Sequence, residues 1–353
     1  MTDNHSSDTR GVLSYPCGTP PERGDTREVA PGVQWIRMPL PSALTHINLW
    51  TIADTDGYTL VDTGVYNEDT TAAWNEVLDG PLAGQRPSRV IVTHMHPDHV
   101  GMAGWLMRRF ECRLWMTRLE YLNCRVLVGD TGRAAPDEAI AFYRRAGWDE
   151  NAIGAYRQRF GGFGRMTSPL PDSYRRIQDG EVIRIGQHEW EVVVGSGHTP
   201  EHACLYCPSL RLLISGDQVL PRISSNVSVH PTEPDADPLA DWLASIEKIR
   251  QRVPNDVLVL PAHNEPFVGL HERLDRLASS QRRVLARLHA ALQSPSRVID
   301  VFGTLFARAI SSTDASLLGL ATGESIAHLN YLVARDQASI ETDGDGVAWY
   351  RAR

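Results

Sequence analysis

The 353-residue chain lacks any apolar run long enough to cross a membrane, since no stretch approaches the about 18 consecutive apolar residues that a spanning helix needs. Its first 30 residues also lack the apolar block of a signal peptide, because Asp, Ser, Pro, Gly and Glu interrupt them throughout. These two absences predict a cytoplasmic protein without a membrane partner.

Cysteine, lysine and excess positive charge are also scarce. The five cysteines are an odd number in a long chain, which favours a reducing compartment over a disulfide framework. Lys248 is the only lysine, and 35 basic side chains stand against 43 acidic ones, for a net charge of -8. Because nucleic acids and anionic membranes attract cationic surfaces, this balance disfavours a nucleic-acid partner and leaves a small-molecule substrate as the expected one.

The sequence between residues 31 and 293 alternates strand-like and helix-like segments, which is typical of a layered α/β fold. The residues before it, 1–30, are polar and aperiodic, so we expect a flexible N-terminal tail. The predicted strands cover residues 33–38, 46–53, 58–62, 90–92, 181–185, 189–194, 203–207, 212–215 and 257–260. The predicted helices cover residues 98–110, 119–128, 136–146, 151–160, 238–252 and 269–293.

The C-terminal part of the chain, residues 294–353, has a different pattern. Two helical stretches at residues 297–309 and 325–335 precede a predicted hairpin at residues 338–351. This order predicts a small winged-helix domain. Its five basic and seven acidic side chains disfavour binding to DNA, so packing, dimerisation or closure of a pocket is the expected use.

The most informative motif is the run THMHPDH at residues 93–99, which follows a short apolar strand. In an extended segment, side chains two residues apart point the same way, so His94 and His96 can converge on one ion. Asp98 and His99 begin the predicted helix and can turn toward a neighbouring ion. Imidazole and carboxylate ligands suit zinc, with iron or manganese as alternatives.

Three later polar residues lie just beyond predicted strands, where the loops of a layered fold gather into a site. His198 stands in the loop GSGHTP, Asp217 follows a strand in SGD, and His263 follows another in PAH. Repetition of this pattern predicts that the three residues complete a two-metal site.

These motifs, together with LVDTG around Asp62, resemble those of the metallo-β-lactamase-fold hydrolases in order and spacing over about residues 33–270. The resemblance implies a four-layer αββα sandwich over residues 31–293, with two divalent metal ions at the edge of its sheets. The chain is similar to the branch that joins a glyoxalase II-like core to a C-terminal winged-helix domain. Glu201 and the segment MAG at residues 102–104 depart from that branch, which disfavours glyoxalase II itself. By this resemblance, one metal is held by His94, His96 and His198, the other by Asp98, His99 and His263, and Asp217 bridges them.

The same resemblance implies hydrolysis without a serine or cysteine nucleophile. Two metal ions lower the pKa of a bridging water, so that hydroxide acts as the nucleophile, and one metal polarises the group under attack. Asp98 is expected to be the catalytic carboxylate that orients this hydroxide, and Asp98 or a second water would protonate the leaving group. Asp62 and Thr93 are expected to hold the imidazole rings in place.

A helical block at about residues 118–165 separates two ligand-bearing strands, and we interpret it as a lid over the metals. Packing of its aromatic residues against the core explains them equally well. His46 and His202 are interpreted as hydrogen-bonded structural histidines. The candidate pocket residues are Tyr156, Phe160 and Phe163 from this block, and Asn226 and His230 from a later loop.

Together these observations predict a metal-dependent hydrolase of a small ester, thioester or lactone. One alternative is a phosphodiesterase or ribonuclease, because similar cores with winged-helix tails cut RNA, although the scarcity of basic patches disfavours it. Another is an iron-dependent oxidoreductase of the same fold, although flavin-linked di-iron relatives carry a glutamate where His96 stands. The sequence is also compatible with a homodimer.

Overall fold

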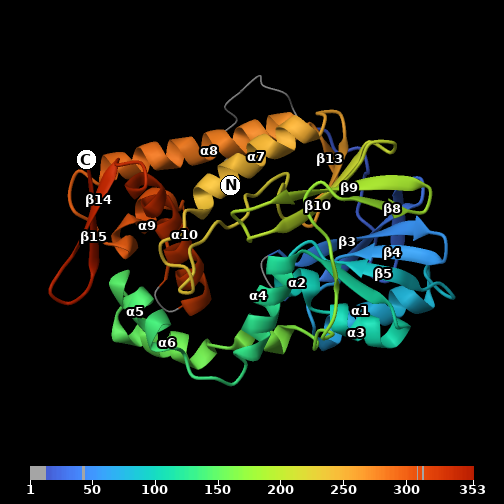
Figure 1. The fold of residues 1–353 in the computed structure, drawn as a ribbon, viewed down its shortest axis with the longest axis horizontal. Helices are drawn as coiled ribbons and strands as arrows, with labels where there is room; N and C mark the ends of the chain where they lie inside the picture. The colour runs from blue at the N-terminus through green and yellow to red at the C-terminus, as the bar shows by residue number, and fades with distance from the viewer. Residues whose placement is uncertain (1–12, 42–43, 308, 312–313) are drawn as a thin grey trace.

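The structure is a computed structural model that describes residues 13–41, 44–307, 309–311 and 314–353. Two mixed β-sheets stack at its centre, and helices cover the outer face of each sheet (Figure 1). The layers therefore follow the order helix, sheet, sheet, helix. This is the α/β architecture that the sequence predicts.

The first sheet contains seven strands in chain order. Its first four strands are antiparallel to their neighbours, whereas β4 to β7 run parallel. Strand β3 is buried on both faces between a helical layer and the second sheet, which explains why its segment INLWTI is mostly apolar rather than alternating. The strands are β1 (Thr26–Ala30), β2 (Val33–Pro39), β3 (His46–Asp54), β4 (Gly57–Val61), β5 (Pro87–Ile91), β6 (Arg113–Met116) and β7 (Arg175–Arg176).

The second sheet contains six strands in the order β13-β12-β11-β10-β9-β8. Strands β11 and β12 are parallel, and the other neighbours are antiparallel. Apolar side chains of both sheets, such as Trp50, Trp190 and Leu205, meet between them in a buried core. The strands are β8 (Val182–Ile185), β9 (His188–Gly195), β10 (His202–Cys207), β11 (Leu212–Gly216), β12 (Leu258–Pro261) and β13 (Phe267–Val268).

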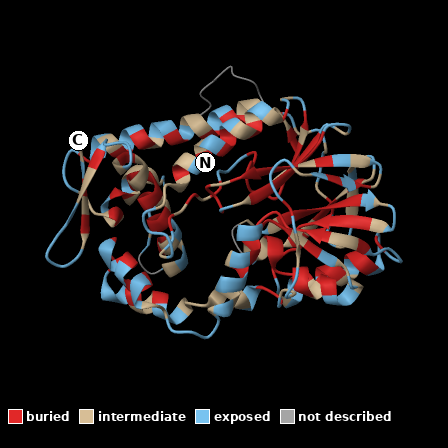
Figure 2. Cartoon of the chain, in the orientation of Figure 1, coloured by how far each residue is buried: buried red, intermediate tan, exposed pale blue. Residues whose placement is uncertain are grey.

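Amphipathic helices form the two outer layers. In α8, buried residues recur every three or four positions from Leu270 to Leu288, and most of them are leucines, so one stripe of the helix faces the core. Figure 2 shows this division, with buried residues along the strands and exposed ones on the outer helix faces. Within the described part of the chain, no helix is both long and apolar enough to span a membrane. Helices α1 (Glu68–Asp79), α2 (Pro97–Val100), α3 (Ala103–Phe110) and α4 (Arg118–Gly129) lie on the side of the first sheet, and α7 (Pro238–Arg252) and α8 (Leu270–Ala291) on that of the second.

Backbone hydrogen bonds join the two sheets at the edge where the predicted ligand loops leave the strands. Ala203 N donates to Thr93 O at 2.8 Å, and Asn48 N donates to Ala262 O at 2.7 Å. The Asn48 side chain also donates from Nδ2 to Pro261 O at 2.9 Å. These contacts bring loops from both sheets to one edge.

The residues predicted as a lid are helical, but part of this block packs against the C-terminal region. Side chains of α5 and α6 share a core cluster with those of α10. Trp148, between α5 and α6, donates from Nε1 to Thr322 Oγ1 of α10 at 2.9 Å. The block contains α5 (Asp137–Arg145), α6 (Glu150–Arg159) and the 3-10 helix η1 (Gly162–Met166) in addition to α4.

The C-terminal region has helices followed by a hairpin, in the predicted order. Its first predicted helix is shorter than expected and its second is longer, and residue 308 of the first lies outside the described residues. Identification of these elements as a winged helix stays a prediction. They are η2 (Val298–Val301), α9 (Phe302–Leu305), α10 (Ala315–Val333), β14 (Ala338–Thr342) and β15 (Ala348–Ala352).

The prediction of a flexible tail over residues 1–30 is wrong from residue 13 onward, and residues 1–12 lie outside the described residues. Leu13 is buried in the core, and Ser14 forms a β-bridge with Val268. Strand β1 then pairs with β2 as the edge of the first sheet. Its sequence TREVA has little apolar periodicity. An edge strand can form by backbone pairing alone, so hydrophobic periodicity does not reveal it. The short strands β6 and β7 and helix α1 were also not predicted.

Asp54, at the end of β3, links the first sheet to a turn of the second. Its carboxylate accepts hydrogen bonds from Ser88 Oγ at 2.9 Å, from Arg89 Nη2 at 2.7 Å and from Gly186 N at 3.1 Å. Burial opposes ionisation, but hydrogen bonds from Thr55, Gly186 and Ser88 and the charge of Arg89 outweigh it and lower the pKa of Asp54 to about 2. The charged form therefore stabilises the fold.

Replacing Asp54 with asparagine should lower the free energy of unfolding at neutral pH by about 2 kcal/mol, because a charged acceptor is lost. Since the pKa of Asp54 is lower in the folded state, its contribution is complete above about pH 4 and fades as the pH falls toward about 2. Urea unfolding of both proteins at about pH 7 and about pH 3 measures this difference. A difference of the same size at both pH values would contradict the prediction. Ser88→Ala, which removes one neutral donor, should cost less.

Candidate metal centre

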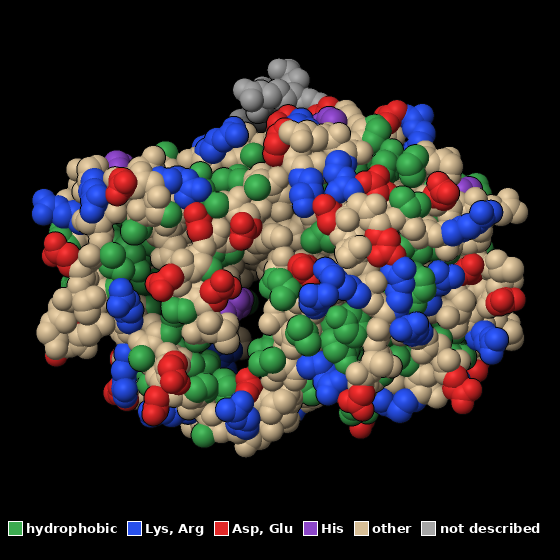
Figure 3. All heavy atoms as spheres, viewed as in Figure 1, with side chains coloured by type: hydrophobic (Ala, Val, Ile, Leu, Met, Phe, Trp, Pro, Cys, Tyr) green, Lys and Arg blue, Asp and Glu red, His purple; other side chains and the backbone are tan. Residues whose placement is uncertain are grey.

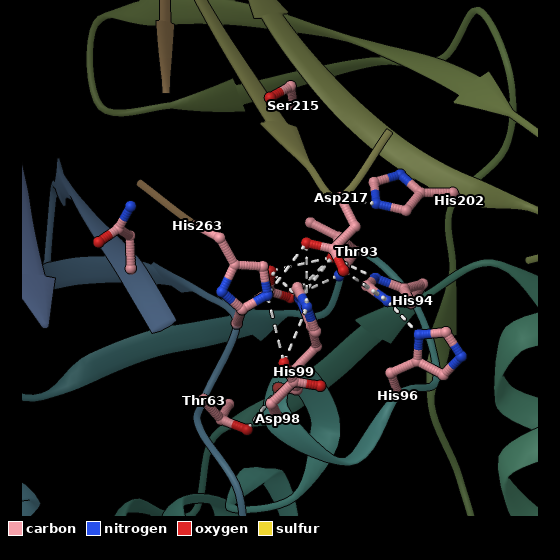
Figure 4. Close-up of polar contacts among 12 residues, drawn as sticks. Thr63, Thr93, His94, His96, Asp98, His99, His202, Ser215, Asp217 and His263 are labelled. Atoms are coloured by element: carbon pink, nitrogen blue, oxygen red, sulfur yellow. Dashed lines mark hydrogen bonds and ion pairs between the residues drawn. The ribbon is translucent and has the colours of Figure 1, made fainter. Parts of the chain in front are cut away.

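The seven side chains predicted as ligands lie together at the edge shared by the two sheets. Figure 4 labels all of them except His198. Their donor atoms form two groups, and within each group all donors lie within 4.8 Å of one another. The segments that follow β5, β9, β11 and β12 supply them, and Asp98 and His99 lie in the short helix α2. The first cluster is His94, His96, His198 and Asp217, and the second cluster is Asp98, His99 and His263.

Asp217 lies between the two clusters. Its Oδ2 is 3.4 Å from His198 Nε2 and 3.9 Å from His94 Nε2. Its Oδ1 is 3.4 Å from His263 Nε2 and 3.6 Å from His99 Nε2. One carboxylate oxygen therefore faces each cluster, as a bridging ligand requires.

Two imidazoles of the first cluster, those of His94 and His96, are held in the neutral form. His94 Nε2 and His96 Nδ1 approach to 2.9 Å, and both face the same point. Burial, and then the neighbouring His99, lower the pKa of His94 well below its usual value. Burial, and then His198, lower the pKa of His96 to about 3. Unprotonated rings whose nitrogens converge are what a divalent metal ion needs.

The second cluster has a more negative environment. Asp98 Oδ2 lies 3.4 Å from His263 Nε2 and 3.8 Å from His99 Nε2. Although burial opposes it, the carboxylates of Asp62, Asp98 and Asp217 raise the pKa of His99 well above its usual value. Asp217 and Asp98 similarly raise the pKa of His263 against the effect of burial. Carboxylates gathered around these rings favour a positive charge at their centre.

Asp62 and Thr93, which the sequence predicts to hold imidazole rings in place, contact the outer nitrogens of two rings. His99 Nδ1 lies 2.8 Å from Asp62 Oδ2, and His94 Nδ1 lies 3.1 Å from Thr93 Oγ1. Thr93 itself donates to Asp62 Oδ1 from its backbone N at 2.8 Å. Asp62 adopts a left-handed backbone with φ 61° directly after β4, which a short polar residue tolerates. These contacts turn the Nε2 atoms of both rings toward the centre.

The outer nitrogens of two further rings face backbone carbonyls. His198 Nδ1 lies 2.7 Å from Asn226 O, and His263 Nδ1 lies 3.0 Å from His46 O. Because a carbonyl oxygen can only accept, Nδ1 is the nitrogen that donates in each ring, and Nε2 is the nitrogen turned toward the cluster. His46 thus acts through its backbone, in keeping with its interpretation as a structural histidine.

Three polar atoms of the centre are buried without a hydrogen-bond partner among the described residues: His99 Nε2, His198 Nε2 and Asp217 Oδ1. A buried acceptor without a partner costs about 1–3 kcal/mol. All three atoms point into the clusters, where a cation would satisfy them. The donor set therefore fits two divalent metal ions.

His202 supports the centre more directly than the sequence indicates. Its Nε2 accepts a hydrogen bond from Asp217 N at 3.0 Å, and its ring stacks on that of His94 with centroids 4.7 Å apart. Burial, and then His198, lower the pKa of His202, so the ring is a neutral acceptor. Gly216 has φ +50°, and a Cβ there would lie 2.6 Å from His202. Strand β10 thereby positions the Asp217 carboxylate between the two clusters.

Glu120 is a supporting residue that the sequence did not reveal. It is fully buried in α4, and it accepts hydrogen bonds from Met95 N at 2.9 Å and from Glu201 N at 2.8 Å. Those amides belong to the loops that carry His96 and His198. Burial raises the pKa of Glu120 against these donors. Its partners are distant in the sequence, so no local pattern could have identified it.

The predicted pocket residues are not all brought to the metals. Tyr156 is buried and contacts Phe160 edge-to-face with ring centroids 5.9 Å apart, within the core shared with α10. Phe163 packs against the core beneath the first sheet. Asn226 contacts His198 as described. His230 has exposed surface, yet the surrounding protein atoms desolvate its ring, and this effect, followed by that of His198, lowers its pKa. Contact of these residues with substrate stays a prediction.

Comparisons with known protein families agree with this fold and site. Residues 44–263 match the Metallo-beta-lactamase superfamily, and residues 285–353 match the Metallo-beta-lactamase-like, C-terminal domain. The chain therefore belongs to the metallo-beta-lactamase superfamily, and its histidine and aspartate clusters are those of a metal-dependent hydrolase.

Individual relatives match most of the chain. A beta-lactamase domain protein from Burkholderia ambifaria is 37% identical with a TM-score of 0.88, over 97% of this chain and 98% of that one. A metallo-beta-lactamase family protein from Thermus thermophilus shares the fold at 22% identity and a TM-score of 0.77, over 92% of this chain and 100% of that one. The acyl-coenzyme A thioesterase MBLAC2 of Gallus gallus is 25% identical over 257 residues, or 70% of this chain and 83% of the relative.

Elemental analysis of the purified protein should find about two transition-metal ions per chain. Asp217→Asn should retain about one or fewer, because this carboxylate faces both clusters and an amide is a weaker ligand. Asp79→Asn, at an exposed carboxylate on α1, is the matched control and should retain both. Circular dichroism checks that each variant is folded. Two ions held as firmly by folded Asp217→Asn would contradict the bridging role.

Proposed function

We propose that the chain hydrolyses a small ester, thioester or lactone with two divalent metal ions. Zinc is the favoured metal. The observation that carries this proposal is the position of Asp217, which presents one oxygen to each of two clusters of histidine and carboxylate donors. Five imidazoles and two carboxylates form a donor set that suits zinc.

When bound, a pair of divalent cations lowers the pKa of a shared water and polarises the group under attack. Asp98 is suited to handle the proton of that water. Burial opposes its charged form, but His99 and His263 outweigh this effect and lower the pKa of Asp98, so the carboxylate is ionised at neutral pH. It can accept a proton and return it to the leaving group. The side chain is 23% exposed, which leaves it accessible to substrate.

An apolar stripe beside the ligand loops supports an acyl substrate. Leu119, Leu122 and Val126 occupy one face of α4 and are 42%, 48% and 58% exposed. The stripe begins next to the centre, because Leu119 N donates to Glu201 Oε2 at 2.8 Å and Glu120 holds both ligand loops. An exposed apolar stripe at this place suits a hydrocarbon chain better than a phosphodiester backbone.

The relatives favour a thioester within this substrate class, since one of them is an acyl-coenzyme A thioesterase. At 25% identity this is a distant similarity, so esters and lactones stay within the proposal.

The helical block from α4 to η1 is proposed as the lid. It begins at the ligand loops, and α5 and α6 reach the C-terminal region on the other side of a hollow in the molecular surface (Figures 1 and 3). A histidine side chain is visible inside this hollow in Figure 3. A block attached at both sides of a hollow is suited to enclose a substrate there.

The metal-loaded protein should hydrolyse at least one class among acyl thioesters, carboxylic esters and lactones, and a strong chelator should abolish this activity. Restoring zinc should recover it, because the proposed nucleophile depends on the metals. Spectrophotometric assays of the three classes, each with and without chelator, measure the result.

Two results would replace the proposal. Cleavage of single-stranded RNA without turnover of any acyl substrate would indicate the nuclease alternative. An iron-loaded protein that consumes oxygen without hydrolysing acyl substrates would indicate the oxidoreductase.

Leu122→Glu should raise KM for acyl substrates by about tenfold, because a charge replaces an apolar contact worth about 1.4 kcal/mol. The value of kcat should change little, since the metal clusters are intact. Val182→Glu on β8 is the matched control: this valine is 57% exposed and lies on another element, so its replacement should leave KM unchanged. Equal KM values for all three proteins would exclude the α4 stripe as a substrate surface.

A further inference from the structure

The loop from Asp217 to Val229 connects the metal centre to the C-terminal helix α10. It leaves the centre at the bridging carboxylate and returns to it at Asn226, whose carbonyl accepts from His198 Nδ1 at 2.7 Å. Ser225 Oγ also donates to the carbonyl of Asp217. One short loop therefore contacts two ligands of the first cluster.

The side chain of Asn226 is fixed by α10. Its Nδ2 donates to Glu324 Oε2 at 2.8 Å, and its Oδ1 accepts from Ser228 Oγ at 2.5 Å. The amide thus has a partner on each side, which holds the residue in one orientation. Glu324 belongs to the C-terminal domain, whereas His198 belongs to the matched region of the hydrolase domain.

A second contact holds the same loop against α10. Val229 N donates to Gly323 O at 3.0 Å. A Cβ at Gly323 would lie 2.8 Å from Val229 O and 2.9 Å from Ser228 Cβ, closer than side chains pack. Glycine at this position lets the loop lie directly on the helix, and it places Glu324 beside Asn226.

The environment of Glu324 preserves this contact across neutral pH. Burial raises its pKa to about 7, although the hydrogen bond from Asn226 opposes the increase. A carboxyl group and a carboxylate both offer an acceptor oxygen, so the bond to Asn226 does not depend on which form is present.

His198 differs from the other ligand histidines in which domain fixes the partner of its outer nitrogen. The outer nitrogens of His94, His99 and His263 face Thr93, Asp62 and His46, all of which lie in the hydrolase domain. Among these described contacts, that of His198 is the one whose partner is held by the C-terminal domain. The geometry of the first cluster is therefore shared between two domains.

We propose that the C-terminal domain completes the first metal cluster, with Glu324 as a positioning residue that acts on His198 through Asn226. The inference rests on the proposed metal centre. Glu324 fixes Asn226, the Asn226 carbonyl holds the proton on His198 Nδ1, and Nε2 is left free to bind a metal ion. Loss of such an outer partner weakens metal binding by about 10- to 100-fold.

The test uses full-length, metal-loaded protein and follows the loss of metal to a chelator. Glu324→Ala should release one ion per chain about 10- to 100-fold faster than wild type, with the other ion lost at its usual rate. Glu324→Gln keeps an acceptor oxygen for Asn226 and should stay close to wild type. With cobalt in place of the native metal, Glu324→Ala should also alter the visible absorption bands, which report on the ligands themselves.

Leu329→Ala is the control for a general loss of stability. Leu329 is fully buried in α10, so its replacement should destabilise the C-terminal domain while leaving Glu324 and Asn226 in place. Thermal unfolding should show a loss at least as large as that of Glu324→Ala, yet metal release should match wild type. If Glu324→Ala does not fold, Asn226→Ala removes the same hydrogen bond from the loop side and should give the same fast release.

The outcomes separate this inference from the proposed function. Wild type that binds no metal would defeat both. Wild type that binds two ions, with Glu324→Ala releasing them at the wild-type rate, would overturn the positioning role and leave the hydrolase proposal intact. Equally fast release from Glu324→Ala and Leu329→Ala would also overturn it, because domain stability would then explain the effect.

Discussion

The structure depends on a buried concentration of polar groups that needs positive charge to be stable. Asp217 directs one oxygen at each of two clusters, and several donor atoms around it are buried without a hydrogen-bond partner among the described residues. Burying unpaired acceptors and like-charged carboxylates together lowers the stability of the fold. Bound cations would remove this cost. The same buried carboxylates and imidazoles that lower the stability of the fold are therefore the groups that would bind the metal ions.

The rest of the fold supplies rigid supports for these groups. The two sheets meet at one edge through hydrogen bonds such as that from Ala203 to Thr93, which brings loops from different strands together. Asp62, His202 and Glu120 then fix the ligand loops from three separate elements. Since each support is itself buried, the donors are held in place before a metal binds, which lowers the cost of ordering them.

The C-terminal region extends this arrangement beyond the sandwich. Its helix α10 contacts the loop beside His198 through Glu324, and it shares a core with the helical block through Trp148 and Thr322. A domain that supplies none of the seven donors can thus influence both the metal centre and the proposed lid. The apolar stripe on α4 supplies the remaining element, a surface that suits the acyl part of a substrate.

The sequence by itself determined the seven donors, because the types of residue that bind metals and their spacing can be read locally. It also determined most of the alternating strands and helices, and hence the positions of the donors just beyond strands, because hydrophobic periodicity is a local property too. It could not reveal β1, which is stabilised by pairing with a neighbour, or Glu120, whose partners are distant in the chain. It named Asn226 as a pocket residue but could not reveal its contacts with His198 and Glu324. It left the role of Tyr156 open because cores and pockets use the same aromatic residues. Tertiary structure decided the distances at which Asp217 faces each cluster and the contact of α10 with the loop beside His198, since both depend on how separate elements pack in space.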